Sequence, residues 1–428
     1  MKKTLIAVAL VLLVLAAMPY AVGWVASMQY RQMVQRIDAQ NASLKLEVTS
    51  YQRGFFSSSA RLRATFTDPR LQIFAGSAGL SYDVEQTISH GPLVPTEHGL
   101  GIAVAGIRSV WHSTGAGPDA NFDALLDTGT NMSGRFAVAD YDQISNQATI
   151  QLHGLKLDFS VNRDVTHFDL VGGVDSAAYT SNMGDGAALK SLAVTMTAER
   201  GANHPWVGPF KVTAAELEVH AAQLGSVRVE NPQFNADSQV DANNNLQAHS
   251  DARFETIHIF GEPYGPLQWQ LNVTNLDAQA ILDLSRELQH SSGAQANAQT
   301  VAFMKYLPAL LRNKPVIELK DFSLQTPTGR LITQFRADVD QATSAQLASP
   351  FTLLQTAHAE LHARIEAGLM HSLAAYYAKQ QGGGDPDALL KQLLGRNLVQ
   401  QDAAGFRVDV IFAQGQVRLN GKPLQIPL

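Results

Sequence analysis

Apolar and polar residues alternate with a period of two along most of this chain of 428 residues. Successive side chains of a β-strand point to opposite faces of a sheet, so this period predicts strands with one apolar and one polar face. Such strands are typical of antiparallel sheets that are covered on one face and wet on the other. The alternating runs start at Leu44, Leu62, Leu155, Leu192, Leu217, Leu267 and Leu331.

Helical patterns are confined mostly to the last third of the sequence. Turn-forming clusters at 241–245 and 326–329 separate alternating runs, and a closing hairpin is expected over 406–419. We therefore predict a mainly β fold with minor α content, built as an elongated antiparallel sheet of long strands. The predicted helices cover 276–288, 298–311, 365–380 and 386–398, the last with Asp385 as N-cap and Pro386 in its first turn.

The N-terminal residues 1–28 form the longest apolar stretch. No side chain from Leu5 to Met28 is charged, and Lys2 and Lys3 precede it. Roughly 22 helical residues cover about 33 Å, enough to cross the hydrocarbon core of a bilayer. We expect a signal-anchor transmembrane helix; the alternative is a cleaved signal peptide with a weak cleavage site at 21–23.

The charge pattern also predicts an orientation. Lys2 and Lys3 favour the cytoplasmic side, which sends residues 29–428 across the membrane, and no later run of 18 apolar residues predicts a second span. Residues 29–37 are polar and helical in pattern, and we expect them to lift the body off the membrane surface.

Composition excludes several classes of site. The chain has no cysteine, which excludes disulfides, thiolate metal ligands and cysteine nucleophiles. The net charge of −6 is small, and no cluster of Lys and Arg predicts a nucleic-acid partner. Hydrophobic residues make up 45% of the chain, too many for a disordered protein.

Several short blocks are spread along the whole chain. Besides the anchor, they are Tyr51-Gln52-Arg53-Gly54-Phe55-Phe56-Ser57, His90-Gly91-Pro92, Thr326-Pro327-Thr328-Gly329 and 405–424. Together they resemble the YdgA-like family of bacterial envelope proteins. The resemblance implies a domain organisation of a signal-anchor over 1–28 and a periplasmic, mainly β body over 29–428, at the inner membrane. It implies no catalytic residues, because the family has no established activity.

His358, Glu360 and His362 are the best metal-ligand candidates. Alternating apolar neighbours predict a strand here, which puts the three side chains on one face. Neighbours on that face lie about 6.6 Å apart, given a rise of about 3.3 Å per residue, which is wide for ligands of one zinc ion. We expect a solvated polar face; a metal site is the alternative.

Two glycine-containing motifs suggest chemistry and have simpler explanations. Residues 99–104 resemble half of a dinucleotide-binding loop, but the third glycine is missing and a strand pattern follows. His90 could be a general base, whereas a strand end followed by a turn at Gly91-Pro92 explains the motif better.

Arg53 lies beside aromatic residues in the segment 51–56. One interpretation is contact with lipid headgroups at the membrane surface. We favour a packed turn that bends at Gly54, with Phe55 and Phe56 entering the core.

These patterns predict no catalytic, cofactor-binding or metal site, and no enzyme activity. We expect a single-pass inner-membrane protein, held through residues 5–28, that is a non-enzymatic envelope scaffold or interaction protein. The alternative is a lipid-binding or lipid-transfer module that uses an apolar β groove. Candidate partners are lipid, envelope proteins or a second copy of the chain, and not nucleic acid.

Overall fold

The chain divides into two compact units, Met1–Thr197 and Ala198–Leu428. The computed structural model describes residues 30, 32, 34, 35, 38, 44–67, 80–96, 99–115, 117–145, 148–201, 204–222, 225–290, 296–339, 355–380 and 385–424. No helix among these residues is long and apolar enough to cross a membrane, and the predicted span at 5–28 lies outside them.

The first unit is an antiparallel meander. Strands β1, β2, β3, β6, β7, β8, β11 and β12 pair in that order, and β4 pairs with β5 in a separate hairpin. The elements are β1 (Leu44–Arg53), β2 (Ser57–Phe66), β3 (Leu80–His90), β4 (Leu93–Thr96), β5 (Gly99–Ile102), β6 (Ala105–Ser113), β7 (Ala120–Leu126), β8 (Met132–Val138), β9 (Tyr141–Ile144), β10 (Ala148–His153), β11 (Lys156–Val161), β12 (His167–Ser181) and β13 (Gly186–Glu199).

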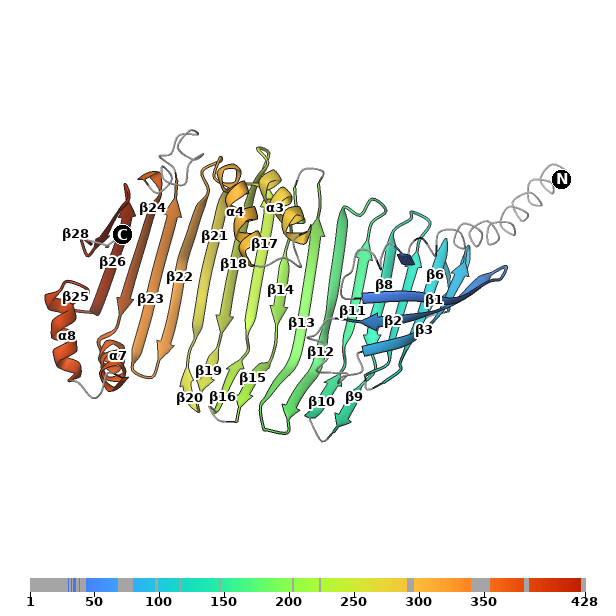
Figure 1. Cartoon of the computed structure of the whole chain (residues 1–428), viewed down its shortest axis with the longest axis horizontal. Helices are drawn as coiled ribbons and strands as arrows, with labels where there is room; N and C mark the ends of the chain where they lie inside the picture. The colour runs from blue at the N-terminus through green and yellow to red at the C-terminus, as the bar shows by residue number, and fades with distance from the viewer. Residues whose placement is uncertain are drawn as a thin grey trace. The chain divides into compact units, whose positions relative to one another are not determined.

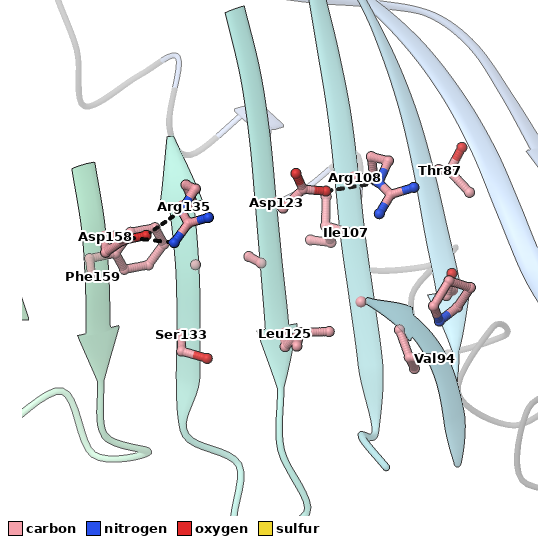
Figure 2. A pocket seen from close by; sticks show the side chains of 15 residues that line it. Thr87, Val94, Ile107, Arg108, Asp123, Leu125, Ser133, Arg135, Asp158 and Phe159 are labelled. Carbon is pink, nitrogen blue, oxygen red and sulfur yellow. Dashed lines mark hydrogen bonds and ion pairs between the residues drawn. The ribbon is translucent and has the colours of Figure 1, made fainter. Parts of the chain in front are cut away.

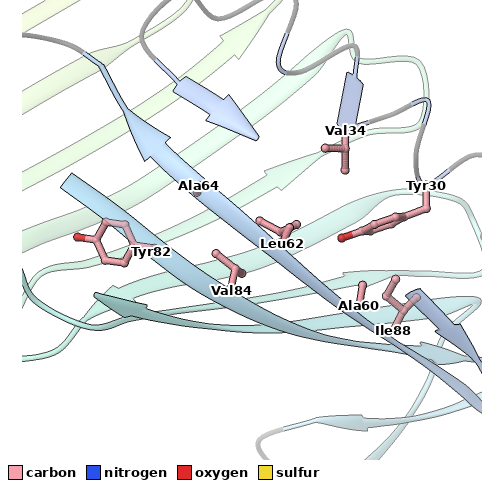
Figure 3. Close-up of a cluster of buried hydrophobic side chains, with 8 residues drawn as sticks. All are labelled: Tyr30, Val34, Ala60, Leu62, Ala64, Tyr82, Val84 and Ile88. Carbon is pink, nitrogen blue, oxygen red and sulfur yellow. The ribbon is translucent and has the colours of Figure 1, made fainter. Parts of the chain in front are cut away.

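The core of this unit includes two residues of the segment 29–37, which the sequence predicts to be polar and helical. Tyr30 and Val34 are helical and buried, and they pack on Leu62 and Val84 of β2 and β3 (Figure 3). The Tyr30 hydroxyl donates a hydrogen bond to the Gln86 side chain, and burial raises the pKa of Tyr30 to about 12. The helical pattern predicted for 29–37 is confirmed at the described residues, and two of its apolar side chains complete this core. That the segment lifts the body off the membrane surface stays a prediction.

The strands of the second unit also pair antiparallel. Strands β14, β17, β18, β21, β22, β23, β24, β26, β27 and β28 pair in that order. Its strands are β14 (Phe210–Thr213), β15 (Glu216–Ala221), β16 (Gly225–Glu230), β17 (Gln233–Val240), β18 (Asn245–Phe254), β19 (Thr256–Ile259), β20 (Glu262–Tyr264), β21 (Leu267–Asp277), β22 (Val316–Thr326), β23 (Gly329–Asp338), β24 (His358–Ile365), β25 (Gln400–Asp402), β26 (Gly405–Ala413), β27 (Gln416–Leu419) and β28 (Lys422–Pro423).

Four described helices of this unit fall where the sequence predicts them. They are α3 (Ala278–His290), α4 (Ala296–Leu310), α7 (Ala367–Gln380) and α8 (Pro386–Gly395). The Asp385 carboxylate accepts a hydrogen bond of 3.0 Å from the Asp387 backbone N–H, which confirms the predicted N-cap. The predicted start of α7 is two residues early, because Ile365 still pairs with Phe406 in the sheet.

The helices contact the sheet near opposite ends of its strands. Helices α3 and α4 contact β21, and α7 contacts β23 and β26 (Figure 1). Leu311, just after α4, packs on Val339, while Met370 of α7 packs with Phe406. The mainly β, antiparallel prediction with helices in the last third is confirmed.

Candidate functional site

The register of the second unit places apolar residues directly opposite one another across six neighbouring strands. Because opposite residues share a face, their side chains form one continuous row. Five interstrand spacings of about 4.8 Å make this row about 24 Å long. We call it the apolar row; its members are Leu271, Leu319, Phe335, Leu361, Val410 and Leu419.

The side chains of the apolar row are all partly exposed. Phe335 of β23 is four residues before Val339, which packs on the segment after α4. It is also four residues after Leu331, which pairs with Ile365 beside α7. Four residues of strand span about 13 Å, so the row runs between the two helix pairs. Trp269, Phe322 and other partly exposed apolar residues continue the same face on its α7 side.

The opposite face of these strands is charged and wet, as the alternation predicts. Arg336 lies 3.2 Å from Asp338 and 4.0 Å from Glu318, each measured between a guanidinium nitrogen and a carboxylate oxygen. Of the two faces of these strands, the one that carries the apolar row is therefore the one that suits an apolar ligand.

His358, Glu360 and His362 lie on this charged face, in strand β24 as predicted. Glu360 lies between the two imidazoles, 3.2 Å from His358 Nε2 and 3.6 Å from His362 Nε2. His362 Nδ1 lies 2.8 Å from Asp409 Oδ1 on β26. Among the described residues no group of three such side chains is arranged to hold a metal ion. The arrangement is a ladder of imidazole–carboxylate pairs.

Asp409→Asn is expected to lower the pKa of His362. The hydrogen bond that the His362 ring donates to the Asp409 carboxylate raises this pKa above its ordinary value, and Glu360 adds to the effect. A raised folded-state pKa stabilises the fold below the unfolded pKa of histidine, and that stabilisation is lost as pH rises through the folded value. NMR titration of histidine ring carbons measures the shift; Asp251→Asn, on another strand, should leave His362 unchanged.

Residues 99–102 of the motif at 99–104 form strand β5, and β6 begins at Ala105, so the prediction that a strand and not a helix follows the motif is confirmed. β3 ends at His90, also as predicted. His90 is buried; its Nε2 lies 3.1 Å from Ser58 Oγ and its Nδ1 lies 3.2 Å from the Phe55 carbonyl oxygen. These contacts make His90 a structural link between β2 and β3.

The prediction that Phe55 and Phe56 enter the core is wrong. The chain does bend at Gly54, where a Cβ would lie 2.4 Å from the Ser57 carbonyl oxygen. The two phenylalanine side chains are 47% and 69% exposed. Leu and Ala residues of β1 and β2 fill the core positions, and the tip of the hairpin projects beyond them.

A pocket of about 440 Å³ in the first unit was not predicted (Figure 2). Val94 of β4 packs on Gly106, where a Cβ would lie 2.4 Å from Val94 Cγ1. The charged groups at the pocket already form two ion pairs, Arg108–Asp123 at 2.9 Å and Arg135–Asp158 at 2.6 Å (Figure 2). The sequence signal was Gly106, because a glycine inside a strand permits close approach of a neighbour.

A second opening, of about 580 Å³, lies between α7 and α8. Leu373, Tyr376 and Tyr377 of α7 line it and are exposed. Their spacing on the helix shows that α7 has a second apolar side besides the one that packs on the sheet, a signal that the sequence carried.

A family model described as "Bacterial protein of unknown function (DUF945)" matches residues 1–427. The chain belongs to this family. The DUF945 model covers both compact units and the predicted anchor, so the apolar row and the N-terminal segment both lie within the residues that it matches. No curated protein and no solved structure matches the chain.

Proposed function

We propose that this DUF945 protein binds the acyl chains of lipids on the apolar row of its second unit. The observation that carries the proposal is the row itself, six partly exposed apolar side chains aligned across six strands. Contiguous apolar surface on a protein often marks a site that binds a lipid, a protein or another ligand. The function is therefore non-enzymatic lipid binding or lipid transfer.

The dimensions suit a lipid chain. One leaflet contributes about half of the 30 Å hydrocarbon core, or about 15 Å, and the row is about 24 Å long. Each methylene moved from water onto an apolar surface contributes about 0.8 kcal/mol when fully buried. Helix pairs at both sides of the row limit the ligand to this strip of the sheet.

We further propose that the protein is a YdgA-like protein, tethered to the bacterial inner membrane through residues 5–28, with its body in the periplasm. The uncharged stretch from Leu5 to Met28 and the preceding Lys2 and Lys3 support this topology. A tether keeps an acyl-binding face close to a supply of lipid.

Trp269 provides a direct test, because it lies next to the apolar row on β21. A variant with Trp24→Phe, Trp111→Phe and Trp206→Phe retains Trp269 as its sole tryptophan. We expect a brominated fatty acid to quench most of its fluorescence, with saturation at one or a few ligands per chain.

The matched control moves the tryptophan by one residue. In the same background, Trp269→Phe combined with Gln270→Trp places the reporter on the charged face of the same strand. We expect little quenching there. Equal quenching of both reporters would mean adventitious partitioning, and no quenching of Trp269 would refute acyl-chain binding.

A protein scaffold is the second candidate, and the opening between α7 and α8 favours it. Exposed aromatic residues such as Tyr376 and Tyr377 are typical of protein interfaces. A photo-reactive amino acid at position 377, in cells, should then form a discrete crosslink. If lipid crosslinks there and protein does not, the scaffold candidate fails.

A further inference from the structure

Two hairpins of the first unit expose apolar side chains at the same end of β3. Phe55 and Phe56 form the tip between β1 and β2, with ring centroids 4.8 Å apart in an edge-to-face arrangement. In the β4–β5 hairpin, Leu93, Leu100 and Ile102 are 59%, 73% and 75% exposed. We call these five residues the anchor-end patch.

Apolar side chains cover the outer face of the β4–β5 hairpin. Leu93 lies opposite Ile102, and Pro95 lies opposite Leu100, so all four share one face. The other face carries Val94, which packs on the sheet, opposite Gly101. Among the described residues of this hairpin, Thr96 alone carries a polar side chain.

Backbone hydrogen bonds at the end of β3 tie it to both hairpins. His90, the last residue of β3, donates its backbone N–H to the Phe56 carbonyl at 2.7 Å. The next residue, Gly91, donates to the Val104 carbonyl at 2.7 Å, and Ala103 donates to Pro92 at 3.0 Å. The backbone under the patch is therefore fixed on both sides of β3.

The chain enters the first unit beside this patch. The ring of Tyr30 lies 5.1 Å from the ring of Tyr51, centroid to centroid, and Tyr51 is four residues before Phe55. Tyr30 is two residues after Met28, where the predicted span ends, and two residues reach at most about 7 Å. Four residues reach at most about 14 Å. Tyr30 also donates a hydrogen bond to Gln86, four residues before the end of β3. The chain therefore enters the first unit toward the end of β3 that carries the patch, and these reaches limit the separation of Met28 and Phe55 to about 35 Å.

We propose that the anchor-end patch rests in the interface of the membrane that holds residues 5–28. The lipid bilayer is the occupant because the chain itself brings the patch to it, and the exposed aromatic and aliphatic side chains match the apolar side of the interface. The inference rests on the proposed anchor. It adds that the first unit has a fixed orientation on the bilayer, with Phe55 and Phe56 inserted.

The absence of cysteine allows a site-specific test in the full chain. Phe56→Cys places an environment-sensitive fluorophore in the patch, at a side chain exposed enough for the fold to tolerate it. The control is Gly115→Cys, just after β6, where a Cβ meets nothing within 4 Å. Nine residues of β6 put the control about 30 Å away, at the other end of the strand.

Both labelled proteins are reconstituted in phosphatidylglycerol–phosphatidylethanolamine vesicles that contain a lipid spin-labelled near the headgroup. We expect the label at 56 to shift to shorter wavelength and to lose more than half of its intensity, and the label at 115 to remain water-like. Resistance of the protein to alkaline extraction is measured on the same vesicles.

Two results would overturn the inference and leave the anchor intact. The first is a water-like label at both positions in protein that resists alkaline extraction. The second is a label at 56 that is shielded from iodide but not quenched by the spin-labelled lipid, which would assign the patch to a second copy of the chain. Extraction of the protein by alkali would instead refute the anchor, and the inference with it.

Discussion

Phe406→Ala is expected to destabilise the second unit by about 3–5 kcal/mol, the usual cost of truncating a buried phenylalanine. Phe406 is 2% exposed, the most buried large side chain in its cluster. It supports Met370 of α7 and lies near Leu390 of α8 in the same cluster, so the cavity would loosen both helices. Hydrogen exchange of the α7 and β26 amides, measured on the full chain in detergent micelles, reports the free energy of local opening.

Phe412→Ala is the matched control, because it removes the same side chain from the same face of the same strand. Phe412 is partly exposed, so less apolar surface returns to water, and we expect less than half of the Phe406 effect. Equal costs at the two positions would show that the sheet face is covered throughout, which would contradict an open apolar row.

The strands and their faces were predictable because the period-two pattern is local. Leu271, Leu361 and Val410 each lie in an alternating run that identifies their apolar face. Their alignment into one row was not predictable, because register depends on the turns and on bulges between strands. The shift between Leu319 and Phe322 in the β22–β23 pairing is one such irregularity, and no local pattern marks it.

The failures of sequence reasoning have a common physical cause. Phe55 and Phe56 are apolar, but burial depends on whether the fold brings something to cover them. Conversely, Tyr30 lies in a polar stretch and is buried because β2 and β3 happen to pass beside it. Composition does not change at Thr197, so the division into two units also left no local signal.

Leu271→Asp is expected to weaken acyl-chain binding at least tenfold, a loss of about 1.4 kcal/mol or more. A bound chain would cover the new carboxylate and remove its water, which costs several kcal/mol for an unpaired charge. Leu271 is partly exposed in the ligand-free protein, so the carboxylate stays hydrated there and the fold should survive. Titration of fatty acid against Trp269 fluorescence measures the dissociation constant, and circular dichroism checks the fold.

Gln270→Asp is the matched control for Leu271→Asp, because it adds the same charge on the other face of the strand. Gln270 precedes Leu271 on β21 and faces the charged side, where it is exposed. Both variants add one negative charge to the same strand, so any general repulsion of a fatty-acid carboxylate is matched. We expect Gln270→Asp to bind like the unmodified protein. Equal loss in both variants would trace binding to electrostatics rather than to the apolar row, and equal retention would place the acyl chain elsewhere on the molecule.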